Sequence, residues 1–127
     1  MFRSHTVRVV ALIAVCALGC SHQGPPDRSL DPEQAKELLV TVLDGWKAGR
    51  PHAEPLESEP SLRVADEDWL VGRRLIDYRL LPGESVVGDR LSCPVGLSME
   101  TPEGRRMSAQ VVYLISTAPE LSVIRVD

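Results

Sequence analysis

The feature that most restricts the fold of this chain is the alternation of apolar and polar residues through its second half. Successive side chains of a β-strand point to opposite faces of a sheet, so a period of two predicts strands with one buried face. The pattern occurs in four segments, with a clear turn sequence at residues 101–104. The expected apolar faces are Ile76, Tyr78 and Leu80; Leu91, Cys93, Val95, Leu97 and Met99; Met107, Ala109, Val111, Tyr113 and Ile115; and Leu121 and Val123 with either Ile124 or Val126.

One amphipathic helix is expected before these strands, over residues 31–48. Asp31 is suited to cap the free amides of its first turn, and Pro32 is suited to its first position. Gly49 and Pro51 end the pattern. Apolar residues follow one another at steps of three and four, which places them on one helix face. They are Ala35, Leu38, Leu39, Val42, Leu43 and Trp46.

A helix with one apolar stripe and a sheet with one apolar face bury both surfaces by packing together. The expected fold class is α+β, with one long N-terminal helix packed on a four-stranded antiparallel meander. This order of elements resembles the cystatin-like and NTF2-like folds over residues 31–127, which implies a curved sheet around the helix. Residues 64–69, with Gly72, Leu75 and Tyr78, also resemble small bacterial lipoproteins, a resemblance that implies no chemistry.

Three shorter features complete the expected fold. Residues 62–64 alternate as a short strand does, and residues 66–72 suit a single helical turn that Asp66 begins and Gly72 ends. Pro94 lacks the amide proton that a strand donates to its neighbour. It therefore predicts that the second strand of the meander lies at a sheet edge or has a bulge there.

Residues 1–20 have the pattern of an export signal. Arg3 and Arg8 give a basic start, and an uninterrupted apolar run covers residues 9–18. That run is too short to span a bilayer, which takes about 20 residues, and it fits a secretory signal peptide. An ordinary secretory signal or a plain N-terminal anchor remains an alternative to the lipoprotein signal described next.

The sequence Ala-Leu-Gly-Cys at residues 17–20 resembles the lipobox of bacterial lipoproteins, with Ala17 and Leu18 in the reverse of the commonest order. The resemblance implies cleavage before Cys20 and diacylglycerol on its thiol. Ser21, which is not acidic, then favours the outer membrane if the host is Gram-negative. We expect a signal peptide over residues 1–19, a lipidated tether over residues 20–30 and a single α+β domain over residues 31–127.

The charge and the cysteines restrict the partners. Residues 20–127 contain 12 basic and 18 acidic residues, a balance of −6, because Arg3 and Arg8 lie before Cys20. An acidic domain repels phosphate backbones, which argues against nucleic-acid binding, and it leaves membrane attachment to the lipid. Cys93 is the only cysteine of the expected domain, and its apolar neighbours predict a buried thiol.

The charged side chains of the domain form no recognisable catalytic, cofactor or metal motif. The three acids at 66–68 do not have the spacing of a calcium loop, so we expect Asp66 to cap a helical turn and the others to be solvated. Arg73 and Arg74 are expected to form local ion pairs with these acids. His52 is interpreted as an exposed loop residue.

These patterns favour a membrane-anchored lipoprotein with a non-enzymatic structural or protein-interaction role at the cell envelope. Its expected partners are the membrane, through Cys20, and an envelope protein, with Trp69, Tyr78 and Tyr113 as candidate ligand or contact residues. One alternative is an NTF2-like small-molecule binder or enzyme that uses Asp77, Tyr78 and Tyr113. Another is a partner strand that adds to the sheet along residues 121–126.

Overall fold

The computed structural model describes residues 30–52 and 62–126, and its one helix of more than a single turn lies within the residues 31–48 that the sequence predicts as helical. Helix α1 covers Pro32–Lys47. Asp31 caps it, because one carboxylate oxygen accepts hydrogen bonds from the amides of Glu33 and Gln34 at 3.1 and 3.2 Å. Gly49 then turns the chain with a φ of +84°, a conformation that favours glycine. The expected signal peptide and tether lie outside the described residues, except for Leu30.

A short strand and a single helical turn follow α1 in the described chain, as expected. Strand β1 covers Leu62–Ala65, and helix α3 covers Glu67–Leu70. The carboxylate of Asp66 caps α3 by accepting from the amides of Asp68 and Trp69 at 2.9 and 3.3 Å.

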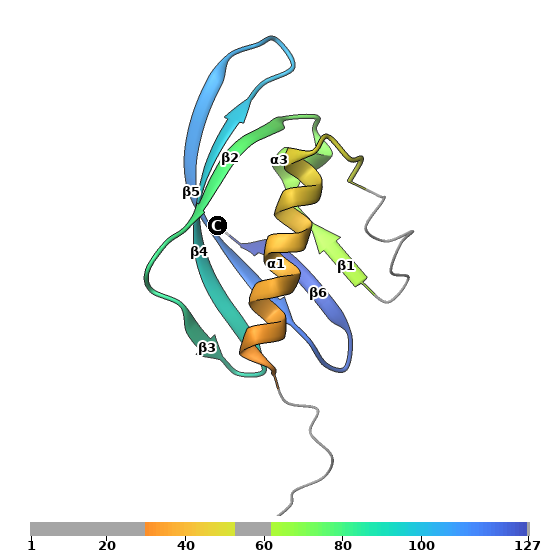
Figure 1. Cartoon of the computed structure of the whole chain (residues 1–127), viewed down its shortest axis with the longest axis vertical. Helices are drawn as coiled ribbons and strands as arrows, with labels where there is room; N and C mark the ends of the chain where they lie inside the picture. Colours follow the sequence, from red (N-terminus) through yellow and green to blue (C-terminus); the bar gives the residue numbers. More distant parts are fainter. Residues whose placement is uncertain (1–29, 53–61, 127) are drawn as a thin grey trace, which may run out of the picture.

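The remaining strands complete one curled sheet (Figure 1). They are β2 (Arg74–Leu80), β3 (Ser85–Val87), β4 (Arg90–Glu100), β5 (Arg106–Ser116) and β6 (Leu121–Val126). The order across the sheet is β1-β6-β5-β4-β2, and β3 pairs with β4 beyond the end of β2. Helix α1 lies across the concave face, and the long β4–β5 hairpin extends past its end (Figure 1).

The expected fold class, α+β with one long helix packed on a four-stranded antiparallel meander, is wrong. The described residues are mostly β-strand, with one short helix and a single helical turn. The described residues form a mixed sheet of six strands, in which β1 runs parallel to β6, and not a four-stranded antiparallel meander. The cystatin-like and NTF2-like resemblance is therefore not supported. Strand β6 is also no free edge over residues 121–124, because β1 pairs with it there and β5 pairs with its other side, which argues against a partner strand that adds along this strand.

Strand β2 differs from the prediction by one residue. Leu75 pairs with Met99, but Asp77 pairs with Ser98, so a bulge falls at Ile76. The bulge shifts the alternation. As a result Leu75, and not Ile76, shares the inner face with Tyr78 and is the buried residue of this strand.

Pro94 lies in an interior strand, which corrects the expectation of an edge. Strand β4 pairs with β5 on one side and with β2 and then β3 on the other. Pro94 falls at the junction between those two, where its carbonyl accepts from the amide of Leu81 at 2.9 Å. The register pairs Pro94 with Val112 of β5 but with no residue of β2 or β3, so neither of those two strands needs the amide proton that proline lacks.

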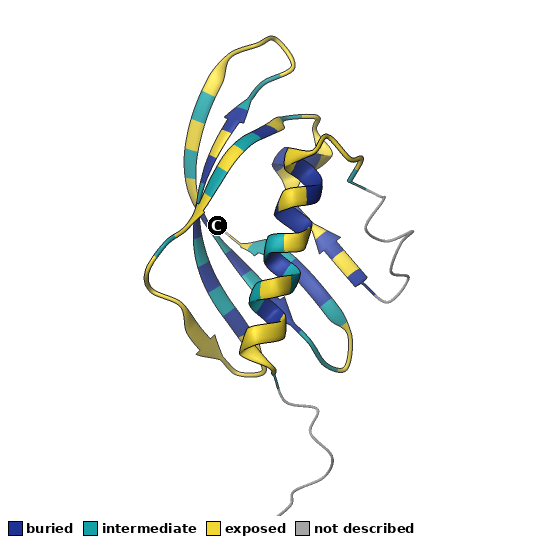
Figure 2. Cartoon of the chain, viewed as in Figure 1, coloured by how far each residue is buried: buried dark blue, intermediate teal, exposed yellow. Residues whose placement is uncertain are grey.

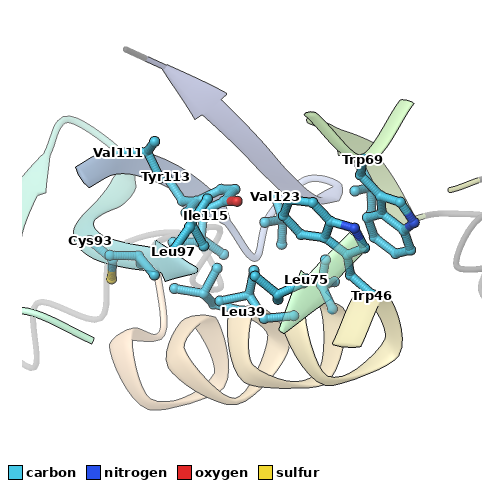
Figure 3. Close-up of a cluster of buried hydrophobic side chains, with 14 of the residues drawn as sticks. Leu39, Trp46, Trp69, Leu75, Cys93, Leu97, Val111, Tyr113, Ile115 and Val123 are labelled. Atoms are coloured by element: carbon cyan, nitrogen blue, oxygen red, sulfur yellow. The ribbon is translucent and has the colours of Figure 1, made fainter. Parts of the chain in front are cut away.

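The core lies between α1 and the concave face of the sheet (Figures 2 and 3). Aliphatic side chains from the helix stripe meet those of β4, β5 and β6, and the rings of Trp46 and Trp69 stack at one end of the cluster, 5.7 Å apart. The largest fully buried side chains are Trp46, Tyr113, Leu39, Leu43, Leu75, Leu91, Leu97, Met99, Ile115, Val95 and Val123.

Candidate functional site

The most unusual group of side chains is a buried ionic cluster at the α3 end of the molecule. Asp66 is the N-cap of α3 and Asp68 lies within α3. Arg73 precedes β2, Tyr113 lies on β5 and Arg125 lies on β6. Both carboxylates are buried. Buried charges are costly unless they are paired, so their contacts decide what the cluster can do.

Asp66 is held by four hydrogen-bond donors. Besides the two α3 amides, it accepts from the Arg125 guanidinium at 3.3 Å and from the Tyr113 hydroxyl. Tyr113 and Arg125 stand opposite each other in the β5–β6 register, so both point to the concave face where Asp66 lies. Asp66 therefore caps a helix, as expected, and also joins α3 to two strands.

Asp68 bridges two arginines. One carboxylate oxygen pairs with Arg73 and the other with Arg125. Burial raises the pKa of Asp68, but the hydrogen bonds and positive charges of Arg125 and Arg73 outweigh it, so the pKa lies below its ordinary value. Asp68 is thus ionised and buried, which corrects the expectation that it is solvated. The expected ion pairing holds for Arg73, whereas Arg74 pairs instead with Glu100 at 3.6 Å.

Tyr113 stays protonated in this environment. Burial, and then the charge of Asp66, raise the pKa of its phenol far above the ordinary value. Its proton is directed at the Asp66 carboxylate. The cluster therefore consists of two paired carboxylates, two guanidinium groups and a neutral phenol, an arrangement that joins α3 to β5 and β6.

Two surface hollows flank the cluster, and His52 and Leu70 line both. The first has a volume of about 440 Å³ and reaches Asp66 and Arg125. The second has about 430 Å³ and reaches the stacked rings of Trp46 and Trp69. Leu70 and its neighbour Val71 are 68% and 62% exposed. An exposed apolar pair next to surface hollows is a feature of contact surfaces.

His52 is partly buried, which corrects its interpretation as an exposed loop residue. Its ring meets Trp69 edge-on, with the ring centres 5.2 Å apart. The buried Nε2 atom has no hydrogen-bond partner in the structure, and the residues that follow His52 are outside the described chain. The contact with Trp69 makes His52 part of the wall of both hollows.

The three candidate contact residues do not form one surface. Trp69 and Tyr113 are buried, and the Trp69 indole donates to the carbonyl of Arg50 at 2.9 Å. Tyr78 is half-buried and lines a separate hollow of about 310 Å³ over β2, β4 and β5. Its hydroxyl donates to Asp44 at 2.7 Å, and burial together with Asp44 raises its pKa to about 12.

Asp77 and Cys93 have ordinary structural roles. Asp77 pairs with Lys47 at 3.3 Å at the edge of the sheet, and does not approach Tyr113 to form an acid–base pair. Cys93 is a free, buried thiol on the concave face, as the alternation predicted. Burial raises its pKa, so the unreactive thiol form is favoured.

Sequence reasoning missed Arg125 as a member of the cluster. One signal was present: Arg125 follows Leu121 and Val123 at steps of two, so alternation places a charge on an apolar face. A charge in that position requires a buried counter-ion. The partners, Asp66 and Asp68, are 59 and 57 residues away, beyond the reach of any local pattern.

Comparison with known proteins adds no assignment. No family model, curated protein or solved structure matches this chain. Within residues 30–52 and 62–126, no group of three or more His, Cys, Asp or Glu side chains is arranged to hold a metal ion. The helices of this described part include none that is long and apolar enough to cross a membrane.

Proposed function

We propose that this chain is a lipoprotein of the bacterial cell envelope whose domain has a non-enzymatic role, either structural or in binding a protein partner. The observation that carries the proposal is the N-terminal sequence, in which a basic start and an apolar run lead to Gly19 and Cys20. Lipid on Cys20 holds an exported protein at a membrane without a spanning helix. With Ser21 next, the outer membrane is the destination in a Gram-negative host.

The ionic cluster supports the non-enzymatic part of the proposal. Enzymes that use acid–base chemistry keep a titratable group within reach of the substrate, with a pKa near the working pH. Here Asp68 has a lowered pKa, Tyr113 has a raised one, and both are committed to partners. The cluster therefore has the features of a structural contact that holds α3 against β5 and β6.

The α3 end supports a role in binding a protein. Leu70 and its neighbour Val71 expose apolar side chains, and Leu70 lines two hollows. Helix α3 lies near the end of α1 opposite to Pro32 (Figure 1). An exposed apolar pair beside hollows offers a surface for a protein partner.

The test of the anchor compares two cysteines of the same N-terminal segment. The full chain is produced in a bacterial host, its N-terminal peptide is analysed by mass spectrometry, and its partition between detergent and aqueous phases is measured. Wild type and Cys16→Ser are expected to carry diacylglycerol and enter the detergent phase, whereas Cys20→Ser loses both properties. Equal partition of Cys20→Ser and wild type would refute lipidation at this residue.

The test of the binding role uses a photo-crosslinking amino acid at Leu70 in intact cells, with the exposed turn residue Glu103 as the matched control. A discrete protein adduct from position 70, absent at position 103 and reduced by Val71→Asp, is the expected result. Adducts that are the same at both positions, or at neither, count against a partner at the α3 end.

A further inference from the structure

The second of the two hollows at the α3 end, of about 430 Å³, has a basic rim. Arg50, Arg73 and Arg74 all line it, whereas none of its described lining residues is acidic. The acids that pair with the last two arginines, Asp68 and Glu100, do not line the hollow. A molecule placed here therefore meets guanidinium groups rather than carboxylates.

The stacked tryptophan rings hold the backbone of two of these arginines in place (Figure 3). The indole of Trp46 donates to the carbonyl of Arg73 at 2.8 Å, and the indole of Trp69 donates to the carbonyl of Arg50 at 2.9 Å. Both indole N–H groups are thus committed to the backbone, so the ring edges that line the hollow present an apolar surface. The exposed side chain of Leu70 extends this apolar surface.

Two arginines of the rim keep hydrogen-bonding capacity for a ligand, because a guanidinium has five N–H donors. Asp68 contacts one nitrogen of Arg73, whose side chain is 35% exposed. Arg74 lies 3.6 Å from Glu100, which is beyond hydrogen-bond distance, and its side chain is 63% exposed. Glu100 also pairs with Arg106 at 3.2 Å, so two arginines share one carboxylate and leave an excess of positive charge.

The basic rim contrasts with the charge of the rest of the chain, since residues 20–127 contain six more acidic than basic residues. Salt screens exposed charges beyond a Debye length of about 8 Å at physiological ionic strength, so the arginines at the rim decide which charge is accepted in the hollow. Glu67, the exposed acid of α3, lines the first hollow instead. The second hollow is therefore the more basic of the two.

We infer that the partner of the α3 end presents an acidic segment, in which an apolar side chain fills the second hollow and flanking Asp or Glu carboxylates pair with Arg73 and Arg74. Guanidinium groups bind carboxylates through paired, charge-assisted hydrogen bonds, which gives such a contact its specificity. Aromatic residues and arginine are enriched at the centres of protein interfaces. The inference rests on the proposed protein-binding role and adds the chemistry of the partner to it.

The experiment extends the crosslinking of the full chain in intact cells. The photo-crosslinking amino acid is placed at Pro51, which lines only the second of the two hollows, or at Glu67, which lines only the first. Both residues are exposed. We expect a protein adduct from position 51 and none from position 67. Mass spectrometry of the adduct should map the crosslink to a segment in which Asp or Glu residues flank an apolar side chain.

Charge reversal tests the arginine rim. Arg74→Glu should lower the yield of the adduct at least about fivefold, because like charges then face each other. Arg79→Glu is the matched control and should keep the wild-type yield, since Arg79 is an exposed arginine of the same strand that does not line this hollow. Arg74→Gln removes the charge without reversing it and should lower the yield in the same direction. Circular dichroism shows that each variant is folded, and arginine in place of the acids of the mapped segment should restore the adduct of Arg74→Glu.

The outcomes separate this inference from the proposed binding role. Absence of a protein adduct from position 70 overturns the binding role, and this inference with it. An adduct from position 70 that recurs at position 67 but not at position 51 places the partner over the first hollow and overturns this inference alone. Equal yields from Arg74→Glu and Arg79→Glu, or a mapped segment without acidic residues, also overturn this inference alone.

Discussion

Arg125 links the two buried carboxylates of the ionic cluster. Its guanidinium contacts the carboxylates of both Asp66 and Asp68, and its side chain is only 12% exposed. Removing one member of a buried charge cluster leaves the other charges without compensation, and that costs more than the cluster itself contributes.

We expect Arg125→Met to lower the free energy of unfolding by about 3–5 kcal/mol. Arg74→Ala is the control, because Arg74 also pairs with a carboxylate, Glu100, but its own side chain is 63% exposed. Removal of this exposed pair should lower the free energy of unfolding by less than about 1 kcal/mol. Urea denaturation followed by circular dichroism measures both variants. Equal, small losses would contradict a structural role for the cluster.

The lowered pKa of Asp68 predicts how the free energy of unfolding responds to acid. Its pKa is lowered in the folded state, so below pH 5 the unfolded chain, with an ordinary carboxyl pKa of about 3.9, takes up its proton first. The contribution of Asp68 to the free energy of unfolding is therefore fully present above the unfolded-state pKa of about 3.9. It is lost as the pH falls through the lower folded-state pKa. We expect Asp68→Asn to be less stable at pH 7 and to lose less further stability between pH 5 and pH 3.

Urea midpoints at pH 7, 5, 4 and 3 check this response. Glu103→Gln, in the exposed turn between β4 and β5, should keep the wild-type pH profile. If Asp68→Asn shows the wild-type profile as well, Asp68 does not carry this part of the acid response.

At the scale of elements, the sequence predicted those features that depend on interactions between residues close in the chain. Helix α1 and its cap, the α3 turn and the β4–β5 hairpin follow from periodicity, capping and turn residues, and they were confirmed. The parallel pairing of β1 was not predictable, because four residues carry no information on direction and their partner is 59 positions away. The bulge at Ile76 was missed because alternation assumes an unbroken strand.

Two glycines are expected to respond to alanine with opposite signs. Gly45 lies inside α1, and a Cβ there meets only the Arg50 side chain at an ordinary 3.7 Å, so Gly45→Ala should stabilise by about 0.5–1 kcal/mol. Gly72 ends the α3 turn with a φ of +87°, so Gly72→Ala should cost roughly 1–2 kcal/mol. Thermal denaturation of the two variants measures both signs. The same sign for both would contradict the assigned conformations.

At the scale of the whole molecule, α1 and the sheet share one core, and the tryptophan pair belongs to it. We therefore expect tryptophan fluorescence and far-ultraviolet circular dichroism to report the same transition in urea. Separate midpoints would show that the α3 end unfolds independently of the sheet. Leu70→Ala, a change at an exposed residue, should leave the common midpoint within the range of a surface substitution.

The parallel pairing of β1 with β6 also has a consequence for synthesis and transport. Each of residues 62–65 finds its strand partner only among residues 121–124, which the ribosome adds 59 positions later. Until then β1 has no neighbour and β5 has an open side, so the sheet stays incomplete during most of translation. A chain of this topology remains unfolded for longer than a local meander does, and an unfolded chain is the form that a secretion channel can thread.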